Sequence, residues 1–352
     1  MTVDRAGRAS RATITTVARH VGVSVATVSR VMNGHPTVAP ELIERVRAAA
    51  AELGYTASPT ARSLVLGRTH TVAVVVPDLG NPFFQGILRG VARAADVEGY
   101  HVLVADTAED VAAEPDKALR ARGRCDAVVL VSPRLADDRL RDLLPDLGPA
   151  VVVNRRAPDG IVPSLHPDYR AGMAVLADHL ADLGHRRLLY LAGPAGTFSD
   201  RERRAGLADV ARARGLDLTV LPGGVTQDDG ARAAAAVLAT DATAVLAFND
   251  LVAMGLLARL REHGVVVPRE VSVVGFDGID LGAAAAPPLT TVRVPAEEIG
   301  AAAWRRLARL IDGNDAGDDA DAPAAAQSFR PELVVRSSSA PPPTSPTDKE
   351  AS

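Results

Sequence analysis

The sequence predicts an all-α helix-turn-helix head followed by an α/β region of two lobes, each built on a doubly wound parallel sheet. Three observations predict this fold class. The chain has 352 residues, more than one hydrophobic core usually serves. Residues 13–54 carry three short helical patterns and no strand pattern. Residues 70–311 alternate between short apolar runs and longer amphipathic runs, the order that gives parallel sheets covered by helices on both faces.

Eight apolar runs mark the expected strands of the α/β region. They are Val72–Val76, Val102–Ala105, Ala127–Val131, Val151–Val153, Leu188–Ala192, Leu218–Leu221, Ala244–Phe248 and Val271–Gly275. Helical patterns separate the runs, and the first of them places Phe84, Ile87 and Val91 on one face. About eight strand–helix units suggest two doubly wound lobes.

Composition divides the rest of the chain. The predicted segments are a disordered tail at 1–12, a helix-turn-helix domain at 13–57, a linker at 58–69, a two-lobed domain at 70–336 and a disordered tail at 337–352. Both tails are polar and rich in Pro, Ser and Ala, a composition that cannot bury a core. Residues 313–326 are low-complexity and predict a surface loop.

Several classes of protein are excluded by what the sequence lacks. No stretch approaches the roughly 20 apolar residues of a membrane span, and the polar N-terminus is unlike a secretory signal, so we expect a cytoplasmic protein with no membrane partner. Cys125 is the single cysteine and is expected to be a buried thiol. No Cys/His cluster has metal-ligand spacing, so we expect no metal and no cofactor. No glycine-rich phosphate loop follows a strand, so we expect no enzyme and nominate no catalytic residue.

The charge distribution indicates where a polyanion could bind. The net charge is −4, yet residues 1–68 hold nine arginines and four acids, a net of +5, which leaves −9 for the remainder. A basic end on an acidic body suggests that the end meets nucleic acid and the body does not. Chance bias in an arginine-rich chain is the alternative, and charge alone does not decide between them.

Residues 13–33 fit a helix, a tight turn and a second helix. Thr13 can cap the first helix, because its hydroxyl accepts from an early backbone N–H. Gly22 supplies the left-handed backbone that ends this helix, and Ser24 can cap the second. A third helix, 40–53, completes a small apolar core.

The second helix presents two faces. Thr27, Val28 and Val31 fall on the inner face. The outward residues at its start are Val25, Ala26, Ser29 and Arg30. A capped, basic helix after a small-residue turn is typical of a recognition helix that meets base edges in the major groove. An ordinary three-helix bundle is the alternative, and the turn and the charge favour DNA binding.

Residues 13–35, TITTVARHVGVSVATVSRVMNGH, closely resemble the head of the LacI/GalR (lactose-repressor) family of transcriptional regulators. The resemblance continues through ELGY and ARSL and resumes in VPDLGNPFFQGI, LGHRRLLYLAGP, AFNDLVAMG, VPREVSVVGFDGID and PPLTTVRVP, so it spans about 13–336. It implies that the two-lobed region is a sensor with a periplasmic-binding-protein-like fold. Thr16 stands where the family usually has Asp, and Ala39 replaces a usual serine cap before Pro40.

The resemblance also implies a hinge within the linker. Ser58–Leu66 matches a short helix that forms only on operator DNA and presses a leucine, here Leu64, into the minor groove. An ordinary linker is the alternative for the unbound protein, and both descriptions can hold because the segment folds on binding. The expected DNA-binding residues of head and hinge are Thr13, Ser24, Val25, Ala26, Thr27, Ser29, Arg30, Asn33, Arg62 and Leu64.

Polar residues or glycine follow the expected strands, at the carboxyl ends where doubly wound sheets bind ligands. Two lobes that face each other across such ends form a cleft suited to a small polar ligand. The effector-binding residues that the resemblance implies are Asp78, Phe83, Phe84, Asn154, Arg201, Asn249 and Asp277. Arg201 and Asp277 are expected to grip adjacent hydroxyls, because one only donates and the other only accepts. Asn154 stands where many relatives have Asp, and Val225 where many have an aromatic residue.

The function that these features predict is sequence-specific regulation of transcription, as a repressor whose operator affinity is set by a small effector such as a carbohydrate. The expected partners are near-palindromic double-stranded operator DNA, the effector and a second copy of the chain, because one head reads only a half-site. Two alternatives stay open: an activator or dual regulator of the same family, and a sugar-binding protein with no DNA role.

Overall fold

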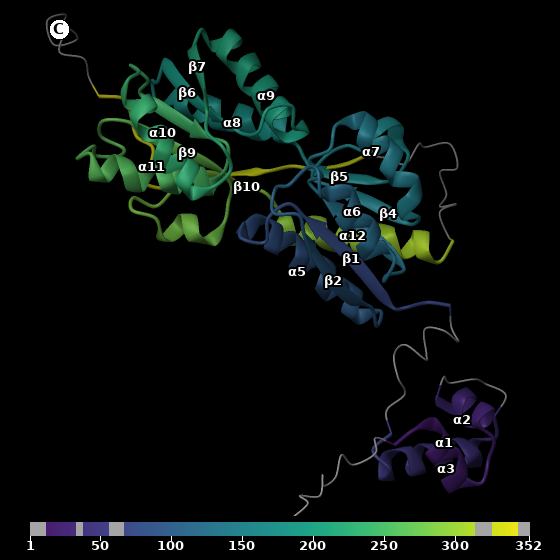
Figure 1. Cartoon of the computed structure of the whole chain (residues 1–352). Helices are drawn as coiled ribbons and strands as arrows, with labels where there is room; N and C mark the ends of the chain where they lie inside the picture. Colours follow the sequence, from purple (N-terminus) through teal and green to yellow (C-terminus); the bar gives the residue numbers. More distant parts are fainter. Residues whose placement is uncertain (1–11, 33–37, 56–66, 314–325, 344–352) are drawn as a thin grey trace, which may run out of the picture. The chain divides into compact units, whose positions relative to one another are not determined.

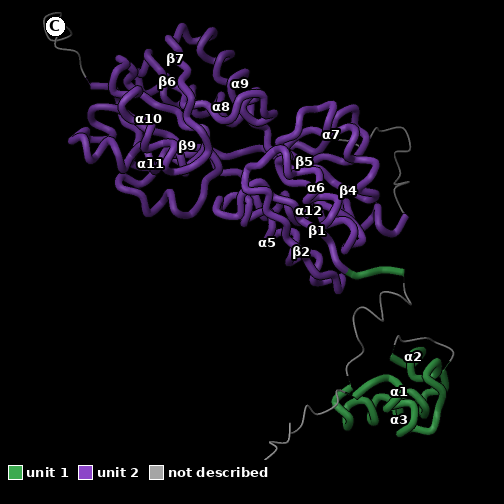
Figure 2. The backbone as a smooth tube through the Cα atoms, viewed as in Figure 1, with its two compact units in different colours: residues 1–70 green, residues 71–352 purple. Residues whose placement is uncertain are grey.

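The computed structural model describes residues 12–32, 38–55, 67–313 and 326–343 (Figure 1). The chain divides into two compact units, residues 1–70 and 71–352 (Figure 2). We call the first unit the head and the second the sensor, and each is described by itself.

The head contains the three predicted helices, α1 (Ile14–Val21), α2 (Val25–Met32) and α3 (Pro40–Glu52). Their buried side chains form one small apolar cluster made of Val17, Ala18, Val28, Val31, Val46, Ala49 and Ala50. The helix-turn-helix fold of the head is therefore confirmed.

Local hydrogen bonds explain why the head's helices begin and end where they do. The Thr13 hydroxyl accepts from the backbone N–H of Thr16, and the Thr16 hydroxyl accepts in return from the Thr13 N–H, 3.4 Å away. This reciprocal capping box satisfies two backbone donors without the acid that the family usually places at residue 16. Gly22 adopts the left-handed conformation that ends α1, with φ of 78°. Ser24 accepts from the N–H of Thr27 at 3.1 Å and so caps α2, as predicted.

The first lobe of the sensor is built on a six-stranded sheet. Its strand order is β11-β5-β4-β3-β1-β2, with all neighbours parallel. The strands are β1 (Thr71–Val76), β2 (His101–Asp106), β3 (Ala127–Val131), β4 (Ala150–Val153), β5 (Ser164–Pro167) and β11 (Gln327–Phe329). Helices α5 (Pro82–Val97) and α12 (Ala296–Ile311) pack on one face, and α6 (Glu114–Arg122) and α7 (Asp137–Leu143) pack on the other. Figure 1 shows α5 and α12 close together in this lobe, where they pack against each other.

The second lobe repeats the arrangement, with strand order β12-β10-β9-β8-β6-β7. Its strands are β6 (Arg187–Ala192), β7 (Asp217–Pro222), β8 (Ala244–Ala247), β9 (Ser272–Asp277), β10 (Thr290–Arg293) and β12 (Glu332–Val334), and only β12 runs antiparallel to its neighbour. Helices α8 (Tyr169–Asp182) and α9 (Phe198–Arg214) cover one face, and α10 (Gln227–Leu238) and α11 (Asp250–Glu262) cover the other. The predicted two-lobed α/β fold is confirmed.

The described chain passes between the lobes where β5 leads into α8, where β10 leads into α12, and where β11 leads into β12. Strands of both sheets therefore end at the junction of the lobes, which positions the residues after them to face each other.

Each of the eight apolar runs corresponds to a strand, and four further strands in the described part of the chain were missed. These four, β5, β10, β11 and β12, span three or four residues each, and β5 contains His166 and Pro167. Such segments carry no apolar run to detect. Of the predicted surface loop, residues 314–325 lie outside the described part of the chain, as do residues 1–11 and 344–352 of the two predicted tails.

The prediction of disorder from residue 337 onward is wrong for the residues that follow β12. Ser338 is fully buried; its hydroxyl donates to the carbonyl of Val273 at 2.5 Å and accepts from the N–H of Thr290 at 2.8 Å. The His185 ring contacts the Ala340 carbonyl at 2.9 Å. Small polar side chains here replace apolar burial with hydrogen bonds to the second sheet, so composition alone gave the wrong expectation.

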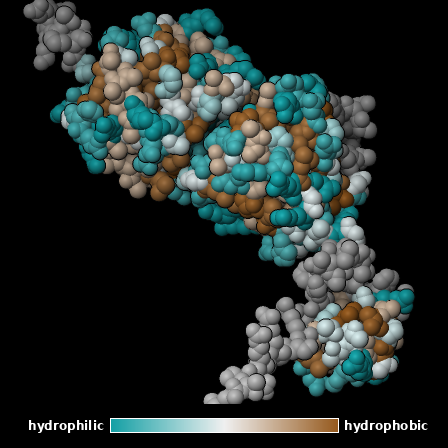
Figure 3. All heavy atoms as spheres, viewed as in Figure 1, coloured by the Kyte–Doolittle hydropathy of each residue, from teal (hydrophilic) through white to brown (hydrophobic). Residues whose placement is uncertain are grey.

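Within the described residues, no helix is long and apolar enough to cross a membrane. The face of the sensor in Figure 3 mixes hydrophilic and hydrophobic residues.

Candidate functional site

The outer face of α2 is the candidate DNA-reading surface. Val25 is 43% exposed, and Ala26 and Arg30 are exposed too, whereas Thr27 and Ser29 are half-buried. Val28 and Val31, on the opposite side, are buried in the core of the head. This burial fixes the rotation of α2 about its axis, so that its first two turns present the same side chains outward.

Charge on the described part of the head is nearly balanced. Four arginines, Arg19, Arg30, Arg45 and Arg47, stand beside the acids Glu41, Glu44 and Glu52 in residues 12–55. The remaining basic excess of the N-terminal region therefore belongs to the sequence on either side of this helical core. Three predicted DNA-binding residues, Asn33, Arg62 and Leu64, lie outside the described residues.

A cavity that is partly open to solvent lies between the two lobes of the sensor, and the empty space in and around it, open solvent included, is about 370 Å³. Its lining residues come from strand ends and helix starts of both lobes: Asp78, Asn81, Phe83, Phe84, Glu109, Ser132, Arg134, Asn154, Ser199, Arg203, Val225, Phe248, Asn249 and Asp277. Three of them, Ser132, Asn154 and Asp277, have φ of 51°, 71° and 110°. Such backbone strain in residues other than glycine concentrates at functional sites, because it aims particular side chains.

The first lobe contributes a closed polar network. The Arg134 guanidinium, with its side chain 7% exposed, donates to both carboxylate oxygens of Glu109 at 2.7 Å. Its Nη1 donates to the Ser132 hydroxyl at 3.0 Å, and the Asn154 amide donates to that same oxygen at 3.1 Å. These groups hold one another in place, and each of the three guanidinium nitrogens of Arg134 has a protein acceptor.

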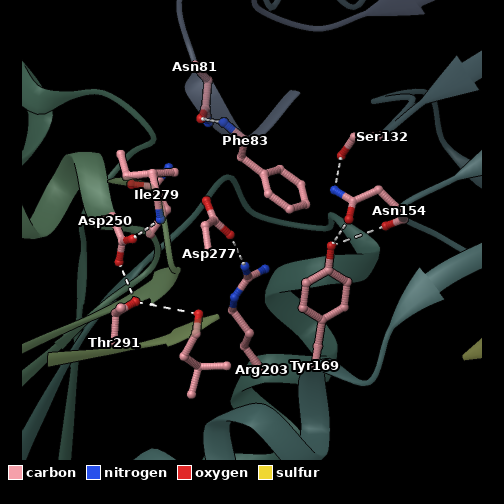
Figure 4. A network of polar contacts seen from close by, with 12 residues as sticks. Asn81, Phe83, Ser132, Asn154, Tyr169, Arg203, Asp250, Asp277, Ile279 and Thr291 are labelled. Carbon is pink, nitrogen blue, oxygen red and sulfur yellow. Dashed lines mark hydrogen bonds and ion pairs between the residues drawn. The ribbon is translucent and has the colours of Figure 1, made fainter. Parts of the chain in front are cut away.

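The second lobe contributes an arginine that is not saturated. The Arg203 side chain is 3% exposed, and its guanidinium carbon lies 4.2–4.4 Å from the ring centres of Tyr169, Phe248 and Phe276. Its Nη2 donates to an oxygen of Asp277 at 3.4 Å (Figure 4). Its Nε and Nη1 are buried and have no hydrogen-bond partner among the described residues. A buried guanidinium with unsatisfied donors offers hydrogen bonds to whatever enters the cavity.

Burial also shifts the pKa values of two acids of the second lobe, Asp277 and Asp250. Burial raises the pKa of Asp277 well above its ordinary value, although the Arg203 cation acts to lower it. Burial raises the pKa of Asp250 to about 7, while hydrogen bonds from the Thr291 hydroxyl (2.5 Å) and the Ile279 N–H (2.8 Å) act to lower it. Asp250 thus ties the end of β9 to β10 and α11, which gives it a structural role behind the cavity (Figure 4).

Comparison with known proteins places this geometry in a family. Residues 13–58 match the model of bacterial regulatory proteins of the lacI family, and residues 177–339 match that of a periplasmic binding protein-like domain. The chain is 32% identical over 312 residues to the HTH-type transcriptional repressor CytR of Escherichia coli, covering 87% of this chain and 92% of that protein. It is 35% identical to the regulator CelR of Thermobifida fusca, with 86% and 92% covered.

The chain belongs to the LacI family.

Solved structures agree with this assignment. The Lac repressor dimer bound to operator and the anti-inducer ONPF superposes with a TM-score of 0.83 at 26% identity, over 94% of this chain and all of that chain. The complex of CelR with cellobiose gives a TM-score of 0.68 at 31% identity, over 93% of this chain and all of that one. This LacI-family chain is therefore a transcriptional regulator with a DNA-binding head and a sensor domain, and its relatives are regulators rather than enzymes.

Six of the seven predicted effector-binding residues line the cavity: Asp78, Phe83, Phe84, Asn154, Asn249 and Asp277. Arg201 does not. Its side chain is 59% exposed and packs over the ring of Phe198. Arg203 occupies the place expected for it beside Asp277. Two residues along a helix rotate a side chain by about 200°, so Arg201 and Arg203 face opposite sides of α9.

Other lining residues escaped the sequence analysis as well, among them Glu109, Arg134 and Ser199. For α9 a signal existed: Ser199, Arg203, Leu207 and Val210 are buried and recur at helical spacing, which puts Arg203 on the inner stripe. For Glu109 and Arg134 no such signal is available, because their pairing joins residues 25 apart in two loops. Within the described ranges, no group of three His, Cys, Asp or Glu side chains is placed to hold a metal ion.

Proposed function

We propose that this LacI-family regulator is a repressor that reads a near-palindromic operator through α2, and that a neutral polyhydroxylated effector such as a carbohydrate, bound between the lobes, controls its affinity for the operator. We place the protein with its DNA in the bacterial cytoplasm and assign it no catalytic step.

The observation that carries the effector proposal is the unsatisfied guanidinium of Arg203. Each buried donor without a partner costs about 1–3 kcal/mol, which a ligand with acceptor oxygens can recover. Asp277 beside it accepts hydrogen bonds when ionised and can also donate one when protonated, so in either state the pair can bind adjacent hydroxyls, each of which both donates and accepts. CelR, a relative of this chain, was solved with cellobiose.

The DNA-reading residues that we propose are those on the exposed start of α2, chiefly Val25, Ala26, Ser29 and Arg30. Small side chains let the helix approach the floor of the major groove, and Arg30 can reach phosphate or a guanine edge. Arg62 and Leu64 are proposed to act in the hinge, where an apolar wedge opens a base step. The solved relative on operator DNA is a Lac repressor dimer.

A dimer needs a contact surface, and we propose that it lies on the sensor, along the free edge of β2. Val97 at the end of α5 is 87% exposed, Val104 in β2 is 37% exposed, and Leu119 in α6 is 39% exposed. Both α5 and α6 adjoin β2. Large apolar side chains exposed beside a sheet edge are the kind of surface that a second copy covers.

The effector assignment is tested by ligand binding to two variants of the same helix. Wild type is first screened by thermal shift against pentoses, hexoses, disaccharides including cellobiose, and nucleosides, because a ligand stabilises the state that it binds. Calorimetry with the compounds found then compares Arg203→Ala with the matched control Arg201→Ala. We expect at least tenfold weaker binding for Arg203→Ala and wild-type binding for Arg201→Ala. Equal affinity in both variants contradicts the assignment.

A further inference from the structure

Tyr169 occupies an unusual place between the lobes. It is the first residue of α8, directly after the chain passes from β5 into the second lobe, and it is 2% exposed. It does not line the cavity, yet it contacts two residues that do, one in each lobe. Figure 4 shows it standing between Asn154 and Arg203.

The hydroxyl of Tyr169 reaches into the first lobe. It donates to the side-chain oxygen Oδ1 of Asn154, which follows β4. With Oδ1 accepting, the amide nitrogen of Asn154 donates to the Ser132 hydroxyl at 3.1 Å. The tyrosine hydroxyl thus fixes which end of the Asn154 amide faces Ser132, and with it the donor that Asn154 offers to the cavity.

The ring of Tyr169 acts in the second lobe. Its centre lies 4.3 Å from the guanidinium carbon of Arg203 and 5.8 Å from the ring centre of Phe276. A guanidinium prefers to lie against an aromatic face, so the ring restricts the plane in which the unsatisfied donors of Arg203 point.

We propose that Tyr169 is a positioning residue that couples the two halves of the effector site, because one side chain orients Arg203 in one lobe and Asn154 in the other. The inference rests on the proposed function, in which this cavity holds the effector. A ligand that moves Arg203 against the ring of Tyr169 then displaces the tyrosine and strains the hydrogen bond from its hydroxyl to Asn154. The two lobes therefore respond to the ligand together. Tyr169 and Asn154 together also set specificity for the ligand, because the oriented Asn154 offers it an amide donor rather than a carboxylate acceptor.

The test uses two buried tyrosines of this chain. Tyr169→Phe keeps the ring and removes the bond between lobes. Tyr190→Phe is the matched control: Tyr190 is fully buried and its hydroxyl donates to Asp200 at 2.9 Å, but both residues belong to the second lobe. Hydrogen exchange of the full-length protein, measured without ligand, reports on the backbone N–H groups of Ser132 and Asn154, which donate to Val153 and Leu165 at 2.7 Å.

Tyr169→Phe is expected to speed exchange at Ser132 and Asn154 about five- to tenfold, the effect of leaving one buried acceptor unsatisfied. Tyr190→Phe should leave both sites at wild-type rates and loosen Gly193, whose N–H also donates to Asp200. Unchanged exchange at Ser132 and Asn154 in Tyr169→Phe, or equal effects of the two variants there, overturns the coupling.

Ligand binding separates this inference from the proposed function. With cellobiose as the probe, or whichever compound the screen gives, Tyr169→Phe should bind at least threefold more weakly than wild type while Tyr190→Phe binds normally. If no compound binds wild type, the proposed function fails, whereas the exchange result still decides whether Tyr169 couples the lobes. Normal binding by Tyr169→Phe, together with altered exchange, overturns its role in positioning the site.

Discussion

Removing Arg203 together with its partner should make the unliganded protein more stable, although it destroys the proposed effector site. The perturbation is the double substitution Arg203→Met/Asp277→Asn. Methionine fills the space among the three aromatic rings around residue 203 and brings no hydrogen-bond donor. Asparagine tolerates the φ of 110° at residue 277. Taking both residues avoids an uncompensated buried charge, which a single substitution would leave behind.

The expected gain follows from the contacts of Arg203. Two buried donors without partners cost about 1–3 kcal/mol each. Removing the guanidinium also removes its contacts with three aromatic rings, which reduces the expected gain in stability by about 1–2 kcal/mol. Replacing a buried ion pair with well-packed groups commonly stabilises a protein by about 1–4 kcal/mol, so we expect about 1–3 kcal/mol here.

Urea unfolding and calorimetric melting measure this change. A gain of that size raises the Tm of the sensor by about 2–12 °C, since about 2–4 °C accompanies each kcal/mol in a domain of this size. Arg201→Met, an exposed position on the same helix, is the control and should stay within about 0.5 kcal/mol of wild type. A double variant less stable than wild type by 1 kcal/mol or more would refute the view that Arg203 is held at a cost for the ligand.

Three further predictions concern other parts of the chain. Arg30→Ala should weaken operator binding and lower the salt slope of log K by about 1, whereas an unchanged slope in a salt titration excludes a phosphate contact. Burial lowers the pKa of His185, so below pH 6.5 the unfolded chain takes up a proton that the folded chain refuses. The stability advantage of wild type over His185→Gln is then complete at pH 7.5 and shrinks by up to about 1 kcal/mol by pH 5.5, and an advantage that grows on acidification contradicts this sign. Gly230→Ala should cost at least 2 kcal/mol in urea unfolding, because the new Cβ meets the Val252 carbonyl oxygen of α11 at 2.0 Å. Gly123→Ala, where the nearest atom lies 3.6 Å away, is its control and should be neutral.

The parts of the fold that the sequence predicted well depend on short-range patterns. The run Val72–Val76 is apolar throughout because its strand is covered on both faces, and Thr13 and Gly22 act on backbone groups within a few residues of themselves. Strand β5 carried no such pattern, because its place in the sheet comes from its neighbours β4 and β11.

The parts that failed depend on contacts between distant residues. Ser338 looked like part of a tail, and only its bonds to Val273 and Thr290 hold it in the second lobe. The family resemblance implied a ligand-binding arginine at the start of α9, which the sequence analysis assigned to Arg201. Arg203, on the buried face of that helix, lies at the cavity instead. The bond of Tyr169 to Asn154 joins residues 15 apart across two lobes, which no local pattern reveals.

The central claim is that a ligand held by Arg203 controls operator affinity from a site that does not touch DNA. The most direct measurement is a titration of the operator, taken from the regulator's own promoter region, with wild type, Arg203→Ala and Arg201→Ala, each with and without the effector found in the screen. We predict equal operator affinity for the three proteins without effector, and an effector-induced change, typically 5–150-fold, in wild type and Arg201→Ala only. Linkage requires operator DNA to change the effector's Kd by the same factor. A full response in Arg203→Ala, or an operator affinity that no cavity ligand alters in wild type, contradicts the account.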